Sequence, residues 1–320
     1  MTGDRDLPTD GGVEAAIRGS SGGAATPSFR LPSGAESGIP AAPQPLAIGP
    51  ATFRWGERTY VMGILNVTPD SFSGDGLLTA GDPLGKAVER ARAMADEGAD
   101  ILDVGGESTR PGHDEVAAAD ELARVVPVVA ALRAALPDTP ISIDTTKPSV
   151  AAAALDVGAD LLNDVWGVAP ANDMLRLAAE RGAPIVLMHN RAEARYTNLI
   201  AEILADLQAA IDRALAAGVA WDAIVVDPGF GFGKTAEHNL ALLRDLGLLR
   251  ALGRPILLGT SRKSTLGKVL DLDADERLEA TLATTALGIA AGVDLVRVHD
   301  VRPNVRAARM TDAIVRGGPS

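Results

Sequence analysis

The chain contains no cysteine. Disulfide bonds, thiolate catalysis and zinc sites built on sulfur are therefore excluded. It also lacks an excess of basic residues, because 42 acidic residues against 30 lysines and arginines leave a net charge of −12. Nonspecific binding to nucleic acid needs a basic face, so we expect no nucleic-acid partner. A few arginines and lysines can still form a local pocket for a small anionic ligand.

Long apolar runs are also missing. No segment approaches the roughly 20 apolar residues of a membrane-spanning helix. The start of the chain lacks the basic region and apolar stretch of a secretory signal, and its acidic residues argue against a transit peptide. We therefore expect a soluble, cytoplasmic protein with no membrane partner.

Residues 1–50 differ in composition from the rest of the chain. They hold seven of the 20 prolines and nine of the 34 glycines, and Phe29 is their only aromatic residue. Such a segment cannot bury enough apolar surface to offset its ordering entropy. The sequence predicts a disordered extension over 1–50, dispensable for stability and turnover, and a single (β/α)₈ barrel domain over 51–320.

After Tyr60, short apolar runs alternate with helical patterns. The predicted strands are 61–66, 101–105, 140–144, 161–164, 184–189, 223–227, 255–259 and 294–299. The predicted helices are 83–97, 117–135, 148–157, 172–181, 199–217, 237–249, 276–291 and 303–316. Alternation with helices implies parallel strands. Eight of each element favour a closed (β/α)₈ TIM barrel over the alternative, an open doubly wound sheet.

Each predicted strand ends at or just before a group that can do chemistry. In a (β/α)₈ barrel these ends meet on one face, where active sites lie. The chain is therefore predicted to be an enzyme. The groups, in order, are Asn66, Gly105-Gly106-Glu107, Asp144, Asn163-Asp164, His189, Asp227, Ser261-Arg262-Lys263 and Arg297-Val298-His299.

Asp144, Asn163 and Asp227 end three of these strands. A carboxylate at such a position can accept two parallel hydrogen bonds from an amidine-like pair of N–H groups. Together the three side chains suit a flat heterocycle that is rich in donors. The alternative is that each caps the helix that follows it. For His189 two interpretations also stay open, a place in the barrel mouth or a cap on the barrel.

Two connections are long and rich in glycine, residues 67–82 and 105–116. Long loops in a compact barrel are usually functional. In the second loop, Arg110 lies between Thr109 and Pro111 and is well placed to meet an anion. Arg297 and His299 share one face of their strand, so they can hold an anion together.

The segment Asp227 to Thr235 ends in Gly-Lys-Thr, as a phosphate-binding P-loop does. A P-loop needs four residues between its first glycine and the Gly-Lys pair. Only three separate Gly229 from Gly233. The spacing therefore argues against a nucleotide triphosphate site.

Seven motifs, taken together, resemble those of the dihydropteroate synthases, a family of pterin-binding barrels. The resemblance runs from about Phe53 to Arg316. One departure is Phe72-Ser73-Gly74-Asp75-Gly76, where the family more often has aspartate directly before two glycines. The motifs are Asn66 to Gly76, Gly105 to Gly112, Ile143-Asp144-Thr145, Asn163-Asp164-Val165, Asp227 to Lys234, Gly259 to Ser264 and Arg297 to Val301.

The resemblance implies a transferase of folate biosynthesis. Such an enzyme joins 4-aminobenzoate to 6-hydroxymethyl-7,8-dihydropterin diphosphate, and gives 7,8-dihydropteroate and pyrophosphate. It also implies a homodimer. Rival interpretations are a methyltetrahydrofolate-corrinoid methyltransferase and a noncatalytic pterin-binding paralogue. Both are disfavoured, because the Ser108 to Gly112 loop and the Ser261 to Lys263 segment are intact.

The resemblance also implies roles for individual residues. The pterin ligands would be Asp144, Asn163, Asp227 and Lys263, with Met188 against the ring. The pyrophosphate ligands would be Asn66, Arg297 and His299, with Mg²⁺ bound by Asn66. The aminobenzoate pocket would comprise Phe72, Thr109, Arg110, Pro111, Phe232 and Ser264. Of these, the residues expected to act in catalysis are Asp144, Lys263, Arg297 and His299.

Overall fold

A computed structural model of the protein describes residues 42–67, 82–107, 116–169 and 173–317. All the predicted strands are confirmed, with ends that shift by at most two residues. They are β3 (Tyr60–Asn66), β4 (Ile101–Gly105), β5 (Ile141–Asp144), β6 (Leu161–Asp164), β7 (Ile185–Met188), β8 (Ile224–Asp227), β9 (Leu257–Leu258) and β10 (Leu295–Val298).

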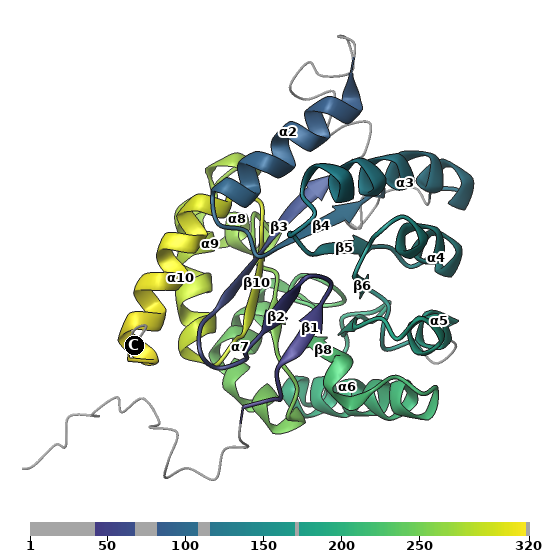
Figure 1. The fold of residues 1–320 in the computed structure, drawn as a ribbon. Helices are drawn as coiled ribbons and strands as arrows, with labels where there is room; N and C mark the ends of the chain where they lie inside the picture. Colours follow the sequence, from purple (N-terminus) through teal and green to yellow (C-terminus); the bar gives the residue numbers. More distant parts are fainter. Residues whose placement is uncertain (1–41, 68–81, 108–115, 170–172, 318–320) are drawn as a thin grey trace, which may run out of the picture.

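Helices follow these strands and cover the outside of the barrel (Figure 1). The predicted helices appear as α2 (Pro83–Asp96), α3 (Ala118–Ala135), α4 (Pro148–Asp156), α5 (Asp173–Arg181), α6 (Leu199–Ala216), α7 (Ala236–Arg244), α9 (Leu278–Ala290) and α10 (Val301–Val315). None of the described helices is both long and apolar enough to cross a membrane.

Two features after β8 differ from the prediction. The helix predicted over 237–249 ends at Arg244, and the 3₁₀ helix η2 (Leu246–Leu252) follows it. Its leucines at 246, 249 and 252 are all buried, because a repeat of three residues matches a 3₁₀ turn. The short helix α8 (Ser264–Leu270) was not predicted, since seven residues are too few to show a 3.6-residue period.

The strands form one parallel sheet in the order β8-β7-β6-β5-β4-β3-β10-β9. A parallel bridge between Val226 and Ile256 then joins β8 to β9 and closes the barrel. The Val226 N–H also donates to the carbonyl of Pro255 at 2.9 Å. The predicted TIM barrel is therefore confirmed, and the open doubly wound sheet is wrong.

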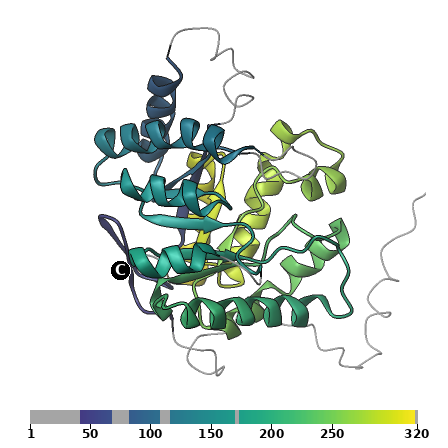
Figure 2. The same ribbon diagram turned by 90° about the vertical axis from the view of Figure 1, so that its right-hand side faces the viewer.

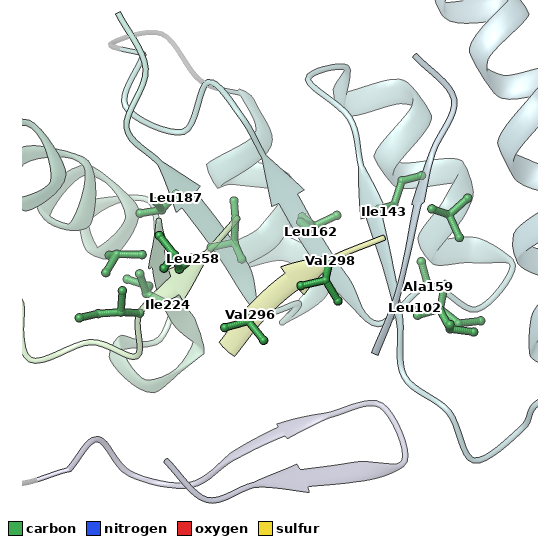
Figure 3. Packing of buried hydrophobic residues seen from close by; sticks show 14 of the residues in the cluster. Leu102, Ile143, Ala159, Leu162, Leu187, Ile224, Leu258, Val296 and Val298 are labelled. Atoms are coloured by element: carbon green, nitrogen blue, oxygen red, sulfur yellow. The ribbon is translucent and has the colours of Figure 1, made fainter. Parts of the chain in front are cut away.

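Side chains alternate between the two sides of each strand, as the pleat requires. Outward residues pack against the helices in one large core, and Figure 3 shows Leu102, Ile143, Leu162 and Leu187 among them. Inward residues near the starts of the strands form a second, apolar cluster inside the barrel. Its members on the barrel strands are Tyr60, Met62, Ile101, Leu161, Val186, Val225, Leu257 and Leu295.

A β-hairpin closes the barrel at the starts of the strands. Strand β1 (Leu46–Ile48) pairs with β2 (Ala51–Phe53) in antiparallel register. Leu46, Ile48 and Phe53 are buried against the inner cluster, together with Trp55. Figures 1 and 3 show the hairpin lying across this end of the barrel, and Figure 2 shows it on the same side as the C-terminal end of α10.

The hairpin corrects the predicted domain boundary. Residues 42–50 were expected to belong to the disordered extension, but Leu46 and Ile48 are core residues of the barrel. The prediction failed because the glycine and proline content was averaged over the whole segment, which hid a three-residue strand at its end. Residues 1–41 lie outside the described part of the chain.

Candidate active site

The polar groups inside the barrel lie at the carboxyl ends of the strands. In the sheet, Asn66 is the partner of Gly105, Gly105 of Asp144, and Asp144 of Asn163, so these residues lie at one level. On the other side Met188 is the partner of Asp227. The sequence prediction that these strand ends converge is therefore confirmed.

Arg297 lies at the centre of the polar cluster. Its Nε donates to Oδ2 of Asp103 at 2.6 Å, and its Nη2 donates to Oδ2 of Asp144 at 2.5 Å. Burial disfavours the charged guanidinium, but the carboxylates of Asp103 and Asp144 outweigh it and raise the pKa of Arg297. Arg297 is therefore a permanent cation inside the barrel.

Asp103 was not identified from the sequence. It is fully buried on β4 and also accepts from Nδ2 of Asn163, at 3.3 Å to Oδ2. The run Ile101 to Val104 had been interpreted simply as an apolar buried strand. A signal was available, because an aspartate two residues before Gly105 shares its inward face.

Asp144 has one oxygen that lacks a partner. Its Oδ2 is bound by Arg297, but Oδ1 is buried and makes no hydrogen bond within the described part of the chain. Buried polar atoms are nearly always paired, so an unpaired one calls for an explanation. Burial raises the pKa of Asp144, and the charge of Arg297 opposes that shift. The free oxygen can accept a hydrogen bond from a ligand.

Asp227 and Lys263 lie on the other side of the barrel mouth. Oδ1 of Asp227 accepts the N–H of Gly229 at 2.7 Å. Burial raises the pKa of Asp227, and the charge of Lys263 opposes this shift only in part. Burial lowers the pKa of Lys263 to about 8. The Lys263 ammonium donates to the carbonyl of Phe230 and lies 4.3 Å from the ring centre of Phe232.

Two contacts join the loops that follow β9 and β10. Ser261 Oγ lies 3.0 Å from Nδ1 of His299. Arg262 forms a two-pronged ion pair with Asp300, at 3.0 and 2.6 Å. Arg262 adopts a left-handed φ of 57°, which a non-glycine residue rarely does. These contacts hold the neighbouring side chains of Lys263 and His299 in place.

A partly buried ion-pair cluster lies where the second long loop leaves and rejoins the barrel. Glu107 Oε1 accepts the N–H of Val116 at 2.8 Å. Lys147, just before α4, donates to Glu107 at 2.5 Å and to the fully buried Glu121 at 2.8 Å. Glu107 therefore connects the two ends of the segment that contains Thr109 and Arg110.

The chain is similar to known proteins over most of its length. A family model described as pterin binding enzyme matches residues 62–299. The chain is 51% identical over 272 residues to the dihydropteroate synthase of Clostridium beijerinckii, covering 85% of this chain and 100% of that relative. The chain belongs to the dihydropteroate synthase family. Its enzymatic class, a transferase of folate biosynthesis, agrees with the sequence prediction.

Solved dihydropteroate synthases have the same fold. The enzyme from Clostridium difficile, in the presence of pteroic acid, is 51% identical with a TM-score of 0.79, and the match covers 82% of this chain and 99% of that one. The enzyme from Xanthomonas albilineans in complex with 7,8-dihydropteroate is 37% identical with a TM-score of 0.78, and covers 86% of this chain and 100% of that one.

Other residues named from the sequence lie outside the polar cluster. Ser264 is the exposed first residue of α8. His189 is fully buried behind the Asp227 loop, so it does not line the barrel mouth. Asp164 faces outward, and its Oδ1 accepts the N–H of Trp166 at 2.9 Å. Phe72, Thr109, Arg110 and Pro111 lie outside the described residues.

The oxygens beside Gly105 are of the kind that magnesium binds. Among the described residues, no three His, Cys, Asp or Glu side chains form a group that could hold a metal. Mg²⁺ usually needs only one or two protein oxygens, because waters and substrate phosphates complete its coordination. Asn66 Oδ1 and Asp144 Oδ2 both lie within 4 Å of the point where a Gly105 Cβ would be.

Proposed function

We propose that this enzyme joins 4-aminobenzoate to 6-hydroxymethyl-7,8-dihydropterin diphosphate, and that the polar cluster in the barrel holds the pterin. The unpartnered oxygen of Asp144 carries the proposal, because a buried carboxylate oxygen needs a donor. The relative from Xanthomonas albilineans binds 7,8-dihydropteroate, the product of this reaction.

In this proposal the pterin lies between Asp144 and Asn163 on one side of the barrel mouth and Asp227 and Lys263 on the other. Asp144 and Asp227 accept from its ring N–H and amino groups, and Asn163 and Lys263 can bind its carbonyl and ring nitrogens. Asn163 is held by Asp103, and Met188 lies beside Asp227 to contact the ring. Two carboxylates on one planar ligand give both strength and orientation.

We propose that the diphosphate lies above Arg297 and His299, with Asn66 as the protein ligand of Mg²⁺. When bound, the ion would neutralise charge on the departing pyrophosphate. Arg297 adds a cation that cannot lose its proton, because its two carboxylate partners raise its pKa. His299 keeps a fixed ring position through Ser261.

The bond that breaks joins the pterin methylene carbon to the diphosphate oxygen, and pyrophosphate leaves with the electron pair. The carbon then becomes electron-poor, and the carboxylate of Asp144 stabilises that charge electrostatically. The amine of 4-aminobenzoate forms the new C–N bond, and its proton passes to the solvent. We propose that Phe232 and Ser264 line the aminobenzoate pocket, with Phe72, Thr109, Arg110 and Pro111 completing it.

We also propose that the enzyme acts in the cytoplasm as a homodimer. Leu287 on α9 and Met310 and Ile314 on α10 are each more than 60% exposed, on helices that pack together. Such an apolar surface favours contact with a second copy. Light scattering should report a dimer, and Met310→Glu should shift the mass toward the monomer.

Asp227→Asn tests the proposed pterin site. A charge-assisted hydrogen bond becomes a neutral one, so binding of the pterin diphosphate should weaken by about 1.5 to 3 kcal/mol in calorimetry. Unchanged affinity would remove Asp227 from the site. Pyrophosphate release that requires both substrates separates a synthase from a noncatalytic paralogue or a corrinoid methyltransferase.

A further inference from the structure

The Gly-Lys-Thr sequence at the end of the Asp227 loop has a role other than phosphate binding. Nζ of Lys234 points into the protein and donates to the carbonyls of Gly229 at 3.0 Å and Phe232 at 3.1 Å. It also lies 2.9 Å from Nδ1 of His189. Thr235 caps α7 by accepting the N–H of His238. Neither side chain is therefore available to a nucleotide.

The contact between Lys234 and His189 has a defined direction. An ammonium only donates, so Nδ1 of His189 must be the acceptor. The ring proton is then on Nε2, which lies 3.1 Å from Oδ2 of Asp206 on α6. Burial keeps the ring neutral by lowering the pKa of His189. Nζ of Lys234 faces three acceptors, the carbonyls of Gly229 and Phe232 and Nδ1 of His189, and only the protonated ammonium has three protons to donate. Burial opposes this charge and lowers the pKa of Lys234.

The loop is tightly packed against the segment that follows β7. A Cβ on Gly229 would lie 1.8 Å from the carbonyl oxygen of His189, and one on Gly233 would lie 2.4 Å from that of Arg191. Both glycines have a left-handed φ, of 67° and 54°. Tyr196 donates its hydroxyl to the carbonyl of Gly233 at 2.8 Å. These close contacts restrict the loop, and Lys234 binds two of its carbonyls.

The opposite side of this loop carries groups of the proposed pterin site. Asp227 accepts the N–H of Gly229, whose carbonyl binds Lys234. Lys263 donates to the carbonyl of Phe230. Lys234 thus binds Gly229, whose own N–H orients Asp227 and whose next residue, Phe230, accepts from Lys263.

We propose that Lys234 is a positioning residue for pterin binding, which with His189 fixes the loop that sets Asp227 and Lys263 in place. The inference rests on the proposed assignment of Asp227 and Lys263 to the pterin. Lys234 does not touch the substrate. It acts through the carbonyls of the loop.

The absence of cysteine allows a test at a single atom. Lys234→Cys introduces the only thiol in the chain, which can be alkylated in the unfolded state before refolding. Alkylation with 2-bromoethylamine restores a side chain of lysine's length that ends in an ammonium. Alkylation with 1-iodopropane gives the same length and a methyl end. Unmodified protein taken through the same cycle, and Lys268→Cys at an exposed position of α8, serve as matched controls.

The propyl form should show a KM for the pterin diphosphate roughly tenfold higher than the refolded control, with kcat changed less than threefold. The aminoethyl form should return to within threefold. Equal pterin KM values for the two alkylated forms would overturn the proposal. Both alkylated forms of the Lys268 variant should match the control.

If the propyl form does not refold, Lys234→Gln decides. Its amide keeps two donors but is one bond shorter and uncharged, so it cannot reach all three acceptors. Weaker pterin binding in the folded variant supports the proposal, and unchanged binding overturns it. Asp227→Asn separates a failure of the positioning role from a failure of the proposed pterin site. If Asp227→Asn weakens pterin binding and the Lys234 variants do not, only the positioning role fails.

Discussion

Arg297 and Asp103 form a buried ion pair inside the barrel, with Nε of the arginine 2.6 Å from Oδ2 of the aspartate. The pair fixes the guanidinium plane so that Nη2 meets Asp144 on the next strand. The position of Arg297 is thus set by two carboxylates before any substrate binds.

Asp103→Asn should destabilise the fold and reduce activity. The amide can offer an oxygen to either Arg297 or Asn163, and its NH₂ group then faces the other donor. Loss of a hydrogen bond to a charged group should lower the free energy of unfolding by about 1.5 to 3 kcal/mol. Denaturant titration measures this. Asp156→Asn, in an exposed ion pair with Arg181, should change little. Equal effects of the two changes would contradict the argument.

The pH dependence of pterin use should follow Lys263. Its ammonium is protonated below a pKa of about 8 and is lost as the pH rises above it. The alkaline limb of kcat/KM for the pterin diphosphate should therefore begin near pH 8, since kcat/KM reports the free enzyme. Asp227, Asp144 and Arg297 are the charged groups that act on Lys263.

Lys263→Arg is the matched variant for this pH profile, because arginine does not lose its proton in the measured range. Its residual activity should show no limb near pH 8. Any change in the protonation of the substrates affects the unsubstituted enzyme and the Lys263→Arg variant equally, so it does not alter the comparison. A limb at the same pH in both would assign it to another group.

Ile48→Ala should destabilise the enzyme although Ile48 lies far from the chemistry. Its side chain is fully buried in the floor of the barrel, and removal of such a side chain costs about 2 to 5 kcal/mol. Thermal unfolding measures the change, with Ala47→Ser at the exposed neighbour as the control. Deletion of residues 1–41 should leave the melting temperature nearly unchanged, and deletion of 1–50 should lower it. Equal melting temperatures for the two deletions would rule out a structural role for the hairpin.

Glu107→Gln should affect the second substrate more than the first. The change removes the ion pair with Lys147 and weakens the bond to Val116, at the ends of the segment that contains Arg110. With about 1 kcal/mol lost, the KM for 4-aminobenzoate should rise about fivefold. Pterin affinity measured without aminobenzoate should change less than twofold. An equal loss for both ligands would place Glu107 in the pterin pocket instead.

Much of the site was predictable because parallel strands bring their carboxyl ends together. Asp144, Asn163, Asp227 and Arg297 could be chosen for this reason alone, without knowing which strands are neighbours. Asp103 was missed because it lies inside a strand. The strand was identified from its length and apolar content, and the face on which each residue lies was not considered.

The partners of Arg297 could not be predicted. Asp103 and Asp144 are 194 and 153 residues away in the chain, and the pairing of β10 with β3, the neighbour of β4, brings them close to Arg297. The same holds for Lys234, whose spacing excluded a P-loop but did not reveal the inward contact with His189. Local patterns specify elements and strand ends, and contacts between distant loops depend on the packed fold.

The sealed end of the barrel also determines how the enzyme can be attached to a surface. The hairpin lies there, and Arg316, just beyond α10, donates to the carbonyl of Gly56 at 3.0 Å, so the described chain enters and leaves on the side opposite the polar mouth (Figure 2). A tether at the C-terminal end, just beyond α10, would therefore point the mouth toward the solution. A sensor chip or an affinity resin loaded this way would present every molecule in a working orientation.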